Sequence, residues 1–370
     1  MKAFPIITDP TYAQPGSLTR YELFWLRMIN DKRDLPFIHL LTRIHLTIVP
    51  LTVILYTNLL SGIWWWLLLV PQFMLSQILM RGSFGLMLHN ITHRRLFKKS
   101  TANWLNKYIT WVICPLFGQV PESYFAHHVG MHHVENNMPE DASSTMGYQR
   151  DSVRDFLRYY GRFILHGATS TFIYLFTRKK TRYYVALSAG QIILYIVVAA
   201  LCFVSFKATL WIFIIPMVFS RLVMMLGNWT QHAFIDPDEP DNAFKSTFNC
   251  INTKYNHKCW NDGYHLMHHL RPGAHYTEMP GMFIRQKNKI ANEQSLVFDG
   301  IHYLHLFLYL MTRNYNKMAD NLVNVNNAFS SREEAIEVMK ERTRKLVKRE
   351  AVKSPSAPVR HAKAVVDVQS

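Results

Sequence analysis

The stretch LTVILYTNLLSGIWWWLLLVPQFMLSQILM, residues 51–80, decides the fold class of this chain. It contains no Asp, Glu, Lys or Arg, and it is interrupted only by a polar turn at Thr57–Asn58 and Ser61–Gly62. It lies inside an apolar block, 41–88, whose basic residues are confined to the ends. Because a membrane helix needs about twenty apolar residues, the block predicts two spans, over about 41–60 and 63–88, joined by a short turn.

A second apolar block runs from Tyr183 to Gly227 and predicts two further spans, over about 183–204 and 209–228, with a turn at Ser205–Thr209. Two shorter apolar stretches, Trp104–Phe117 and Phe163–Phe176, are too short to cross a bilayer. We expect them to form helices that lie in the interface or pack against the bundle. The sequence therefore predicts an all-α integral membrane protein with four transmembrane helices in two hairpins.

The composition agrees with a membrane protein, because only 18% of the residues are charged while 49% are hydrophobic. A soluble domain has about 25% charged residues. The Lys and Arg residues cluster beside the span ends, in 94–99 and 178–182, whereas the two turns contain only Lys207. The positive-inside rule then predicts that both termini and the central loop are cytoplasmic. The net charge of +16 suits anionic lipid and an acidic protein partner, and no nucleic-acid motif accompanies it.

Other sequence features divide the chain and bound its chemistry. We expect a cytoplasmic N-terminal segment over 1–37, a membrane domain with a cytoplasmic helical cap over 38–329, and a charged helix followed by a disordered tail over 330–370. The first twenty residues contain no apolar run, so no signal peptide is predicted. The four cysteines have no CxxC spacing, which indicates reduced thiols rather than an iron–sulfur or zinc-ribbon site.

Nine of the eighteen histidines fall into four groups, which are the candidate site. The first group, His89 with His93, directly follows the second span, and the second, His128 with His132 and His133, lies in the central loop. The third, His232 with Asn228 four residues earlier, follows the fourth span, and the fourth, His265 with His268 and His269, lies in the polar segment after it.

Residues at i and i+3 or i+4 lie on one face of a helix, so members of each group can face one metal ion. The group in the central loop fits less well, because His133 lies about 100° from His132 on a regular helix. Either that helix is distorted, or the two adjacent histidines face different metals. Imidazole-rich ligation suits iron, zinc or copper, and nine ligands exceed the four of a structural zinc site. The pattern predicts two metals at the cytoplasmic membrane surface.

The segments HNITH (89–93), HHVGMHH (127–133), NWTQH (228–232) and YHLMHH (264–269) resemble the histidine boxes of the membrane fatty acid desaturase/hydroxylase superfamily. The resemblance covers about 89–280. It implies two iron ions, an acyl chain in a tunnel between the helices, and O₂ activated with electrons from ferredoxin or cytochrome b5 and an NAD(P)H reductase. The implied iron ligands are the nine histidines together with Asn228, which would act directly or through a water molecule.

Acidic and polar residues beside the boxes are candidates to orient the ligands, since metal-bound imidazoles commonly donate their other N–H to such groups. The candidates are His127, Glu135, Asp141 and Asp262. His127 is also an alternative ligand in place of His128, and Asp262 is equally an N-cap of the following helix. Asp236 and Asp238 are weaker candidates, and Asp236 suits a turn.

The resemblance implies O₂-dependent oxidation of a long fatty acyl chain, with desaturation as the first expectation. The wider context also resembles a bacterial branch that includes terminal-alkene-forming fatty acid decarboxylases, and hydroxylation of a lipid, alkane or carotenoid is a further alternative. In one departure, the first box has HxxxH where some members have HxxxxH. A metal or proton transporter would place ionisable residues near the bilayer midplane, and stretches such as Ile192–Val204 have none.

Overall fold

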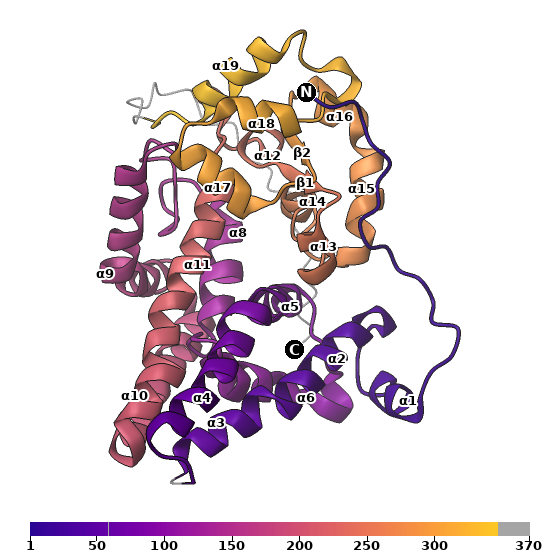
Figure 1. The fold of residues 1–370 in the computed structure, drawn as a ribbon. Helices are drawn as coiled ribbons and strands as arrows, with labels where there is room; N and C mark the ends of the chain where they lie inside the picture. The colour runs from indigo at the N-terminus through magenta and orange to yellow at the C-terminus, as the bar shows by residue number, and fades with distance from the viewer. Residues whose placement is uncertain (58, 347–370) are drawn as a thin grey trace.

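The computed structural model describes residues 1–57 and 59–346, and its regular elements are almost all helices (Figure 1). The first part of the chain forms the helices that carry the apolar blocks. They are α1 (Arg20–Leu26), η1 (Lys32–Asp34), α2 (Leu35–Leu46), α3 (Ile48–Tyr56), α4 (Gly62–Phe73), η2 (Met74–Leu79), α5 (Arg81–His93), α6 (Lys99–Tyr108), η3 (Ile109–Ile113), α7 (Cys114–Leu116), η4 (Phe125–His132), α8 (His133–Glu135), α9 (Val153–Thr177), α10 (Thr181–Thr209), η5 (Leu210–Ile214) and α11 (Ile215–Gln231).

Three helical stretches within the described residues are long and apolar enough to cross a membrane: Lys32–Tyr56, Gly62–Leu79 and Thr181–Gln231. Many of their large apolar side chains face outward, as in Phe203, which is 93% exposed. Such exposure suits lipid rather than water. The third stretch covers both predicted spans of the second block, and its backbone leaves helical geometry at Ser205, where the sequence predicts a turn. The coarse prediction of a helical membrane protein is confirmed, and the arrangement in two hairpins stays a prediction.

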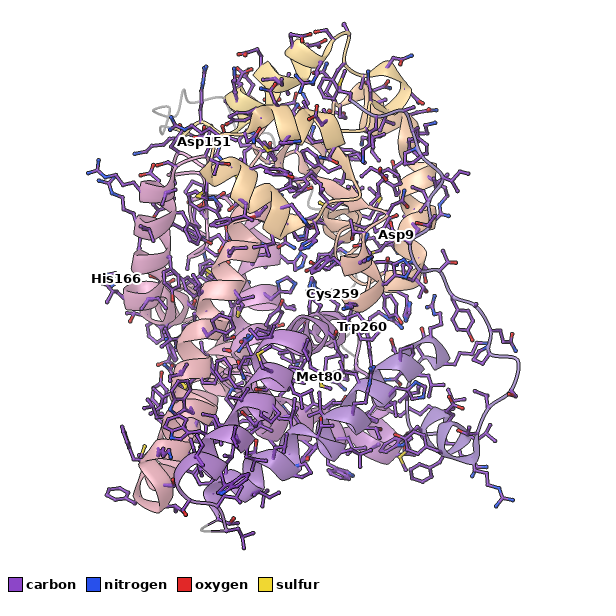
Figure 2. All side chains as sticks on the ribbon, in the orientation of Figure 1. Asp9, Met80, Asp151, His166, Cys259 and Trp260 are labelled. Atoms are coloured by element: carbon purple, nitrogen blue, oxygen red, sulfur yellow. The ribbon has the colours of Figure 1, made fainter. Side chains whose placement is uncertain are left out.

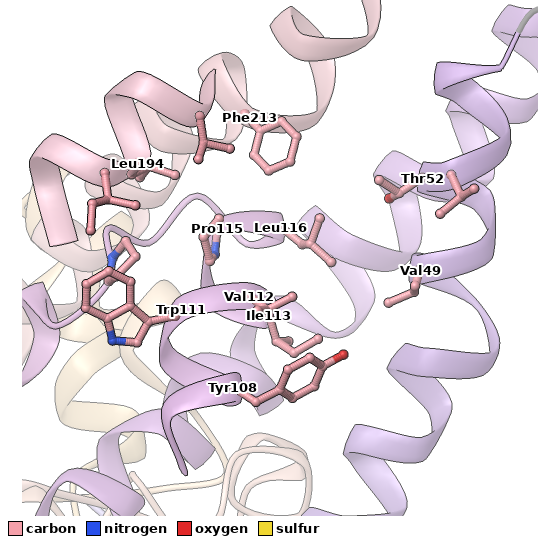
Figure 3. A pocket seen from close by; sticks show the side chains of 14 residues that line it. Val49, Thr52, Tyr108, Trp111, Val112, Ile113, Pro115, Leu116, Leu194 and Phe213 are labelled. Atoms are coloured by element: carbon pink, nitrogen blue, oxygen red, sulfur yellow. The ribbon is translucent and has the colours of Figure 1, made fainter. Parts of the chain in front are cut away.

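The two short apolar stretches differ in their structure. Phe163–Phe176 belongs to the much longer helix α9, whereas Trp104–Phe117 is divided among α6, η3 and α7. Neither is among the candidate spans. Residues of η3 and α7 line an apolar pocket of about 360 Å³ together with α3, α10 and η5 (Figure 3).

A cap of short elements follows α11 and lies over one end of the long helices (Figure 1). Its elements are α12 (Ala243–Ser246), β1 (Asn249–Ile251), α13 (Lys254–Lys258), α14 (His265–Leu270), η6 (Tyr276–Glu278), α15 (Met279–Arg285), α16 (Lys287–Asn292), β2 (Val297–Asp299), α17 (Tyr303–Met311), α18 (Tyr315–Asn321), η7 (Val325–Asn327) and α19 (Arg332–Arg342). Strands β1 and β2 pair in parallel, with Asn249 opposite Val297.

Both ends of the described chain join the cap. Lys2 bridges to Val323 and forms an ion pair with Asp299. The charged helix predicted over Ser330–Glu350 is α19, and it is not fully exposed, because Ala335 and Met339 are buried in the apolar core of the cap. The tail predicted from Ala351 lies outside the described residues.

The cap is tied to the start of α5. The indole N–H of Trp260 donates to the carbonyl of Ser83 (2.7 Å), and the hydroxyl of Ser83 donates to the carbonyl of Lys258 (2.8 Å). Figure 2 shows Met80, Cys259 and Trp260 near one another at this junction. The last turns of α5 also meet α14, where the Nε2 of His89 lies 2.9 Å from the Nε2 of His268, so two histidine groups come together.

Candidate metal centre

Helix α5 supplies the first two histidines from its last turns. His89 and His93 are four residues apart and therefore share one face, and their ring centroids are 5.6 Å apart. The side chain of His89 is buried, with the cap above it.

The central loop supplies three histidines from a π-helix, η4, and the first residue after it. The backbone N–H of His133 bonds to the carbonyl of His128, five residues earlier, as a π-helix requires. This winding brings His128 and His133 together, with 3.0 Å between their Nε2 atoms, and turns His132 to another side. The helix is thus distorted, and the adjacent His132 and His133 also face different clusters.

The remaining histidines come from the end of α11 and from α14. His232 caps α11, and its Nε2 lies 3.3 Å from the Nε2 of His265. His265 in turn approaches His269, one turn further along α14, with 3.0 Å between their Nε2 atoms. His268 points elsewhere, toward His89 and His133.

The histidines form two neighbouring clusters, each able to hold a metal ion. The first contains His89, His93, His128, His133 and His268, and the second contains His132, His232 and His269. His265 adjoins the second cluster through its contacts with His232 and His269. The clusters touch, since the ring centroids of His133 and His269 are 5.3 Å apart. All nine predicted histidines are therefore brought together.

Burial favours the neutral form of eight of the nine clustered imidazoles, and the neutral form is the one that binds metals. Burial lowers the pKa of His93 to about 4 and that of His232 to about 3. Burial, with neighbouring imidazoles, also lowers the pKa of six further histidines well below the ordinary value; these are His89, His128, His133, His265, His268 and His269.

The ring nitrogens fit a cation better than they fit each other. The Nε2 of His268 lies 2.9 Å from the Nε2 of His89 and 2.8 Å from that of His133. A ring nitrogen carries either one N–H or one lone pair, so it cannot make regular hydrogen bonds with both neighbours. The buried Nε2 of His93 has no hydrogen-bond partner among the described residues. Converging lone pairs of this kind match a metal such as iron, for which imidazole is a common ligand.

Asp141 orients one of the ligands. Its Oδ2 accepts a hydrogen bond from Nδ1 of His132 (2.6 Å), and its Oδ1 accepts from the backbone and hydroxyl of Ser143. Burial favours a raised pKa for Asp141, but His132 and these hydrogen bonds outweigh it and hold the pKa below its usual range. The carboxylate fixes the His132 proton on Nδ1 and leaves the Nε2 lone pair free. The Asp-x-Ser spacing is typical of such a turn, but the sequence does not reveal its histidine partner.

Asp262 lies on the other side, next to His89. Its Oδ1 is 3.7 Å from Nδ1 of His89, and its Oδ2 accepts from the hydroxyl of Tyr255 (2.8 Å) and the amide of Gln231 (3.2 Å). Burial raises its pKa to about 7. The sequence does not single out Tyr255, which lies outside the histidine boxes, or Gln231, which lies within NWTQH but is not one of its histidines.

The other candidates make different contacts. Glu135 accepts a hydrogen bond from the hydroxyl of Tyr174 and lies 3.9 Å from Arg178, so its carboxylate faces these two residues rather than a histidine. His127 stacks near His132, at 6.4 Å between ring centroids, and belongs to neither cluster. The amide nitrogen of Asn228 donates to the carbonyl of Ser143 and to the hydroxyl of Tyr159.

Asp236 and Asp238 form a turn, in which the backbone N–H of Asp238 donates to the Asp236 carboxylate. Asp236 also lies 3.4 Å from the guanidinium of Arg342, in an ion pair of the cap. This agrees with the expectation that Asp236 belongs to a turn.

A cavity of about 380 Å³ reaches both clusters. Its lining includes His89, His128, His132 and His265 together with the apolar side chains of Phe84, Phe117 and Met224. An elongated apolar ligand in this cavity would lie against the histidine nitrogens.

Long apolar helices beside two touching clusters of buried imidazoles define a membrane metalloenzyme with a dinuclear, histidine-rich centre. The family model described as fatty acid desaturase matches residues 63–293, more than half of the chain. The chain therefore belongs to the fatty acid desaturase family and is a non-haem di-iron oxidoreductase. No curated protein and no solved structure matches it.

Proposed function

We propose that the protein desaturates a long-chain fatty acyl substrate with O₂ at a di-iron centre. Family membership supports di-iron oxidation of fatty acyl chains. The observation that carries the proposal is the cavity, because its lining combines apolar side chains with histidines of both clusters, so that a methylene group in it would meet the metals.

We assign the first iron to the five histidines of the first cluster and the second to His132, His232, His269 and His265. Asn228 lies beside the second site in the cavity lining, where its side-chain oxygen would bind the iron directly or through water. The two irons, when bound, supply the O₂ activation and the hydrogen abstraction.

The protein supplies positioning and exclusion of water. Asp141 holds His132 in one tautomer, and the buried Asp262 lies beside the Nδ1 edge of His89. The apolar walls hold the chain and keep water from the reacting carbon.

We further propose that residues 38–329 form one catalytic domain with both termini on the cytoplasmic side, in two helical hairpins. The distribution of Lys and Arg supports this orientation. Family membership implies an external electron donor, and the basic surface favours an acidic one such as ferredoxin or cytochrome b5.

Product analysis tests the reaction. The chain is expressed in a host that lacks the activity, and total lipids and volatile hydrocarbons are analysed by mass spectrometry, with His268→Ala as the inactive control. We expect new internal double bonds with the wild type only. A terminal alkene one carbon shorter would instead establish decarboxylation, and an added oxygen would establish hydroxylation. Identical profiles for the two proteins would refute the proposal.

A further inference from the structure

Arg81, the first residue of α5, is buried beside the cavity without a counter-ion. It is 8% exposed and belongs to the cavity lining. No carboxylate among the described residues lies within ion-pair distance of its guanidinium. The guanidinium donates to the side-chain oxygen of Gln77, and its buried Nε has no hydrogen-bond partner in the described part of the chain.

The other buried arginines are satisfied by the protein itself. Arg150 donates to backbone carbonyls that include those of Ala233 and Arg342, each at 3.0 Å. Arg342 donates to the carbonyl of Gln294 (2.9 Å) and pairs with Asp236. A buried cation is costly unless it is paired or fully hydrogen-bonded. Arg150 and Arg342 meet this condition, whereas Arg81 has neither an ion pair nor a full set of hydrogen bonds among the described residues.

Polar groups accompany Arg81 in the cavity lining. Gln119 and Ser220 line the same cavity, and the amide of Gln119 donates to the Ser220 hydroxyl (2.7 Å). The separate apolar pocket in Figure 3 has no charged residue in its lining. Of these two pockets, the cavity at the clusters is the one that combines an apolar wall with a cation that a ligand can neutralise.

We propose that Arg81 binds the carboxylate of a free fatty acid whose chain fills the cavity. The planar guanidinium matches a carboxylate, which can accept two parallel N–H bonds. This assignment rests on the proposed function, which supplies the fatty chain, and deepens it by naming the substrate class as the free acid rather than a thioester.

The position of Arg81 also selects the carbons that react. Arg81 and His89 are eight residues apart on α5, or about 12 Å along the axis at about 1.5 Å per residue. Both side chains lean toward the N-terminus of the helix, so this separation is kept at their ends. A carboxylate at Arg81 places the middle of the chain at the clusters, which favours an internal double bond over loss of the carboxyl group.

Ligand binding to the iron-loaded, full-length protein in lipid nanodiscs tests the assignment. The dissociation constants of palmitate, methyl palmitate and palmitoyl-CoA are measured for the wild type, Arg81→Gln, Arg81→Lys and Arg221→Gln. Arg221 is the control, because it lies on α11 but not in the cavity lining. Iron content and thermal unfolding show whether each variant is folded.

We expect wild type and Arg221→Gln to bind palmitate at least tenfold more tightly than methyl palmitate. Arg81→Gln should lose most of this preference while it still binds the ester, and Arg81→Lys should keep part of it. Equal binding of acid and ester by the wild type overturns the assignment, even if Arg81→Gln does not fold. So does a preference that survives in folded Arg81→Gln, or tighter binding of palmitoyl-CoA that is insensitive to Arg81.

Turnover separates this inference from the proposed function. Palmitate binding that depends on Arg81, with no oxidised product when reductant and O₂ are supplied, would refute the proposed function and support the carboxylate site. A desaturated product without Arg81-dependent binding would refute the carboxylate site and support the proposed function.

Discussion

The Nδ1 atom of His132 lies 2.6 Å from the Oδ2 atom of Asp141, and both side chains are buried. Asp141 is itself held by Ser143, so the carboxylate cannot turn away. A carboxylate behind an imidazole fixes the ring and raises its basicity toward a metal. The second cluster thus has a supported ligand.

Replacing Asp141 tests this support. Asp141→Ala should lower iron affinity or turnover by about 10- to 100-fold, the usual range for loss of such a partner. The measurements are iron per chain after dialysis and the rate of product formation. Glu140→Ala is the matched control, because Glu140 is adjacent and exposed. Equal iron content in the Asp141 variant and the control would show that the hydrogen bond is unimportant.

Two adjacent histidines test the division into clusters. His268 belongs to the first cluster and His269 to the second. His268→Ala and His269→Ala should each abolish oxidation and reduce bound iron, because each removes a ligand of a different ion. His257→Ala, an exposed histidine nearby, should behave as wild type. Mössbauer spectra of the two loaded variants should differ, and identical spectra would contradict separate sites.

Arg150 tests how the cap is held to the centre. Its guanidinium donates to the carbonyl after His232, at Ala233, and to carbonyls at the end of α19. Arg150→Met should lower the free energy of unfolding by several kcal/mol, at about 1–3 kcal/mol for each buried carbonyl left unpaired.

Thermal unfolding in detergent measures this effect, with Arg158→Met as the control. Arg158 forms an exposed ion pair with Asp155, which is worth at most about 1 kcal/mol. A Tm that falls no further for Arg150→Met than for the control would show that the hydrogen bonds of Arg150 do not stabilise the cap against the centre.

The orientation is open to cysteine labelling. In a Cys202→Ser background, Ser61→Cys and Lys207→Cys should react with an impermeant reagent only from the side opposite the cap, whereas Glu333→Cys should react from the cytoplasmic side. The expectation follows from the positive-inside rule. Cytoplasmic labelling of either turn would overturn the proposed topology.

The sequence predicts the histidine groups well, because metal-binding residues recur at helical spacing close to apolar spans. It does not predict which histidines share a cluster. That division depends on the π-helical winding of η4, which pairs His128 with His133 rather than with His132. Neither the composition nor the spacing of the residues predicts such a local change in helical winding.

The supporting carboxylates are harder still, because their partners are set by tertiary structure. Asp141 and Glu135 look equivalent in the sequence, yet only Asp141 reaches a histidine, while Glu135 turns toward Tyr174. Arg81 looks like the basic end of an apolar block, and only the cavity reveals its missing partner.

The π-helix η4 has a consequence for assembly of the enzyme. Its consecutive residues His132 and His133 serve different clusters, as do His268 and His269 on α14. An ion that enters one cluster therefore immobilises backbone that also carries ligands of the other, so the second ion meets donors already ordered. Loading should be cooperative, and half-filled molecules should be scarce when ferrous iron is titrated into the apoprotein.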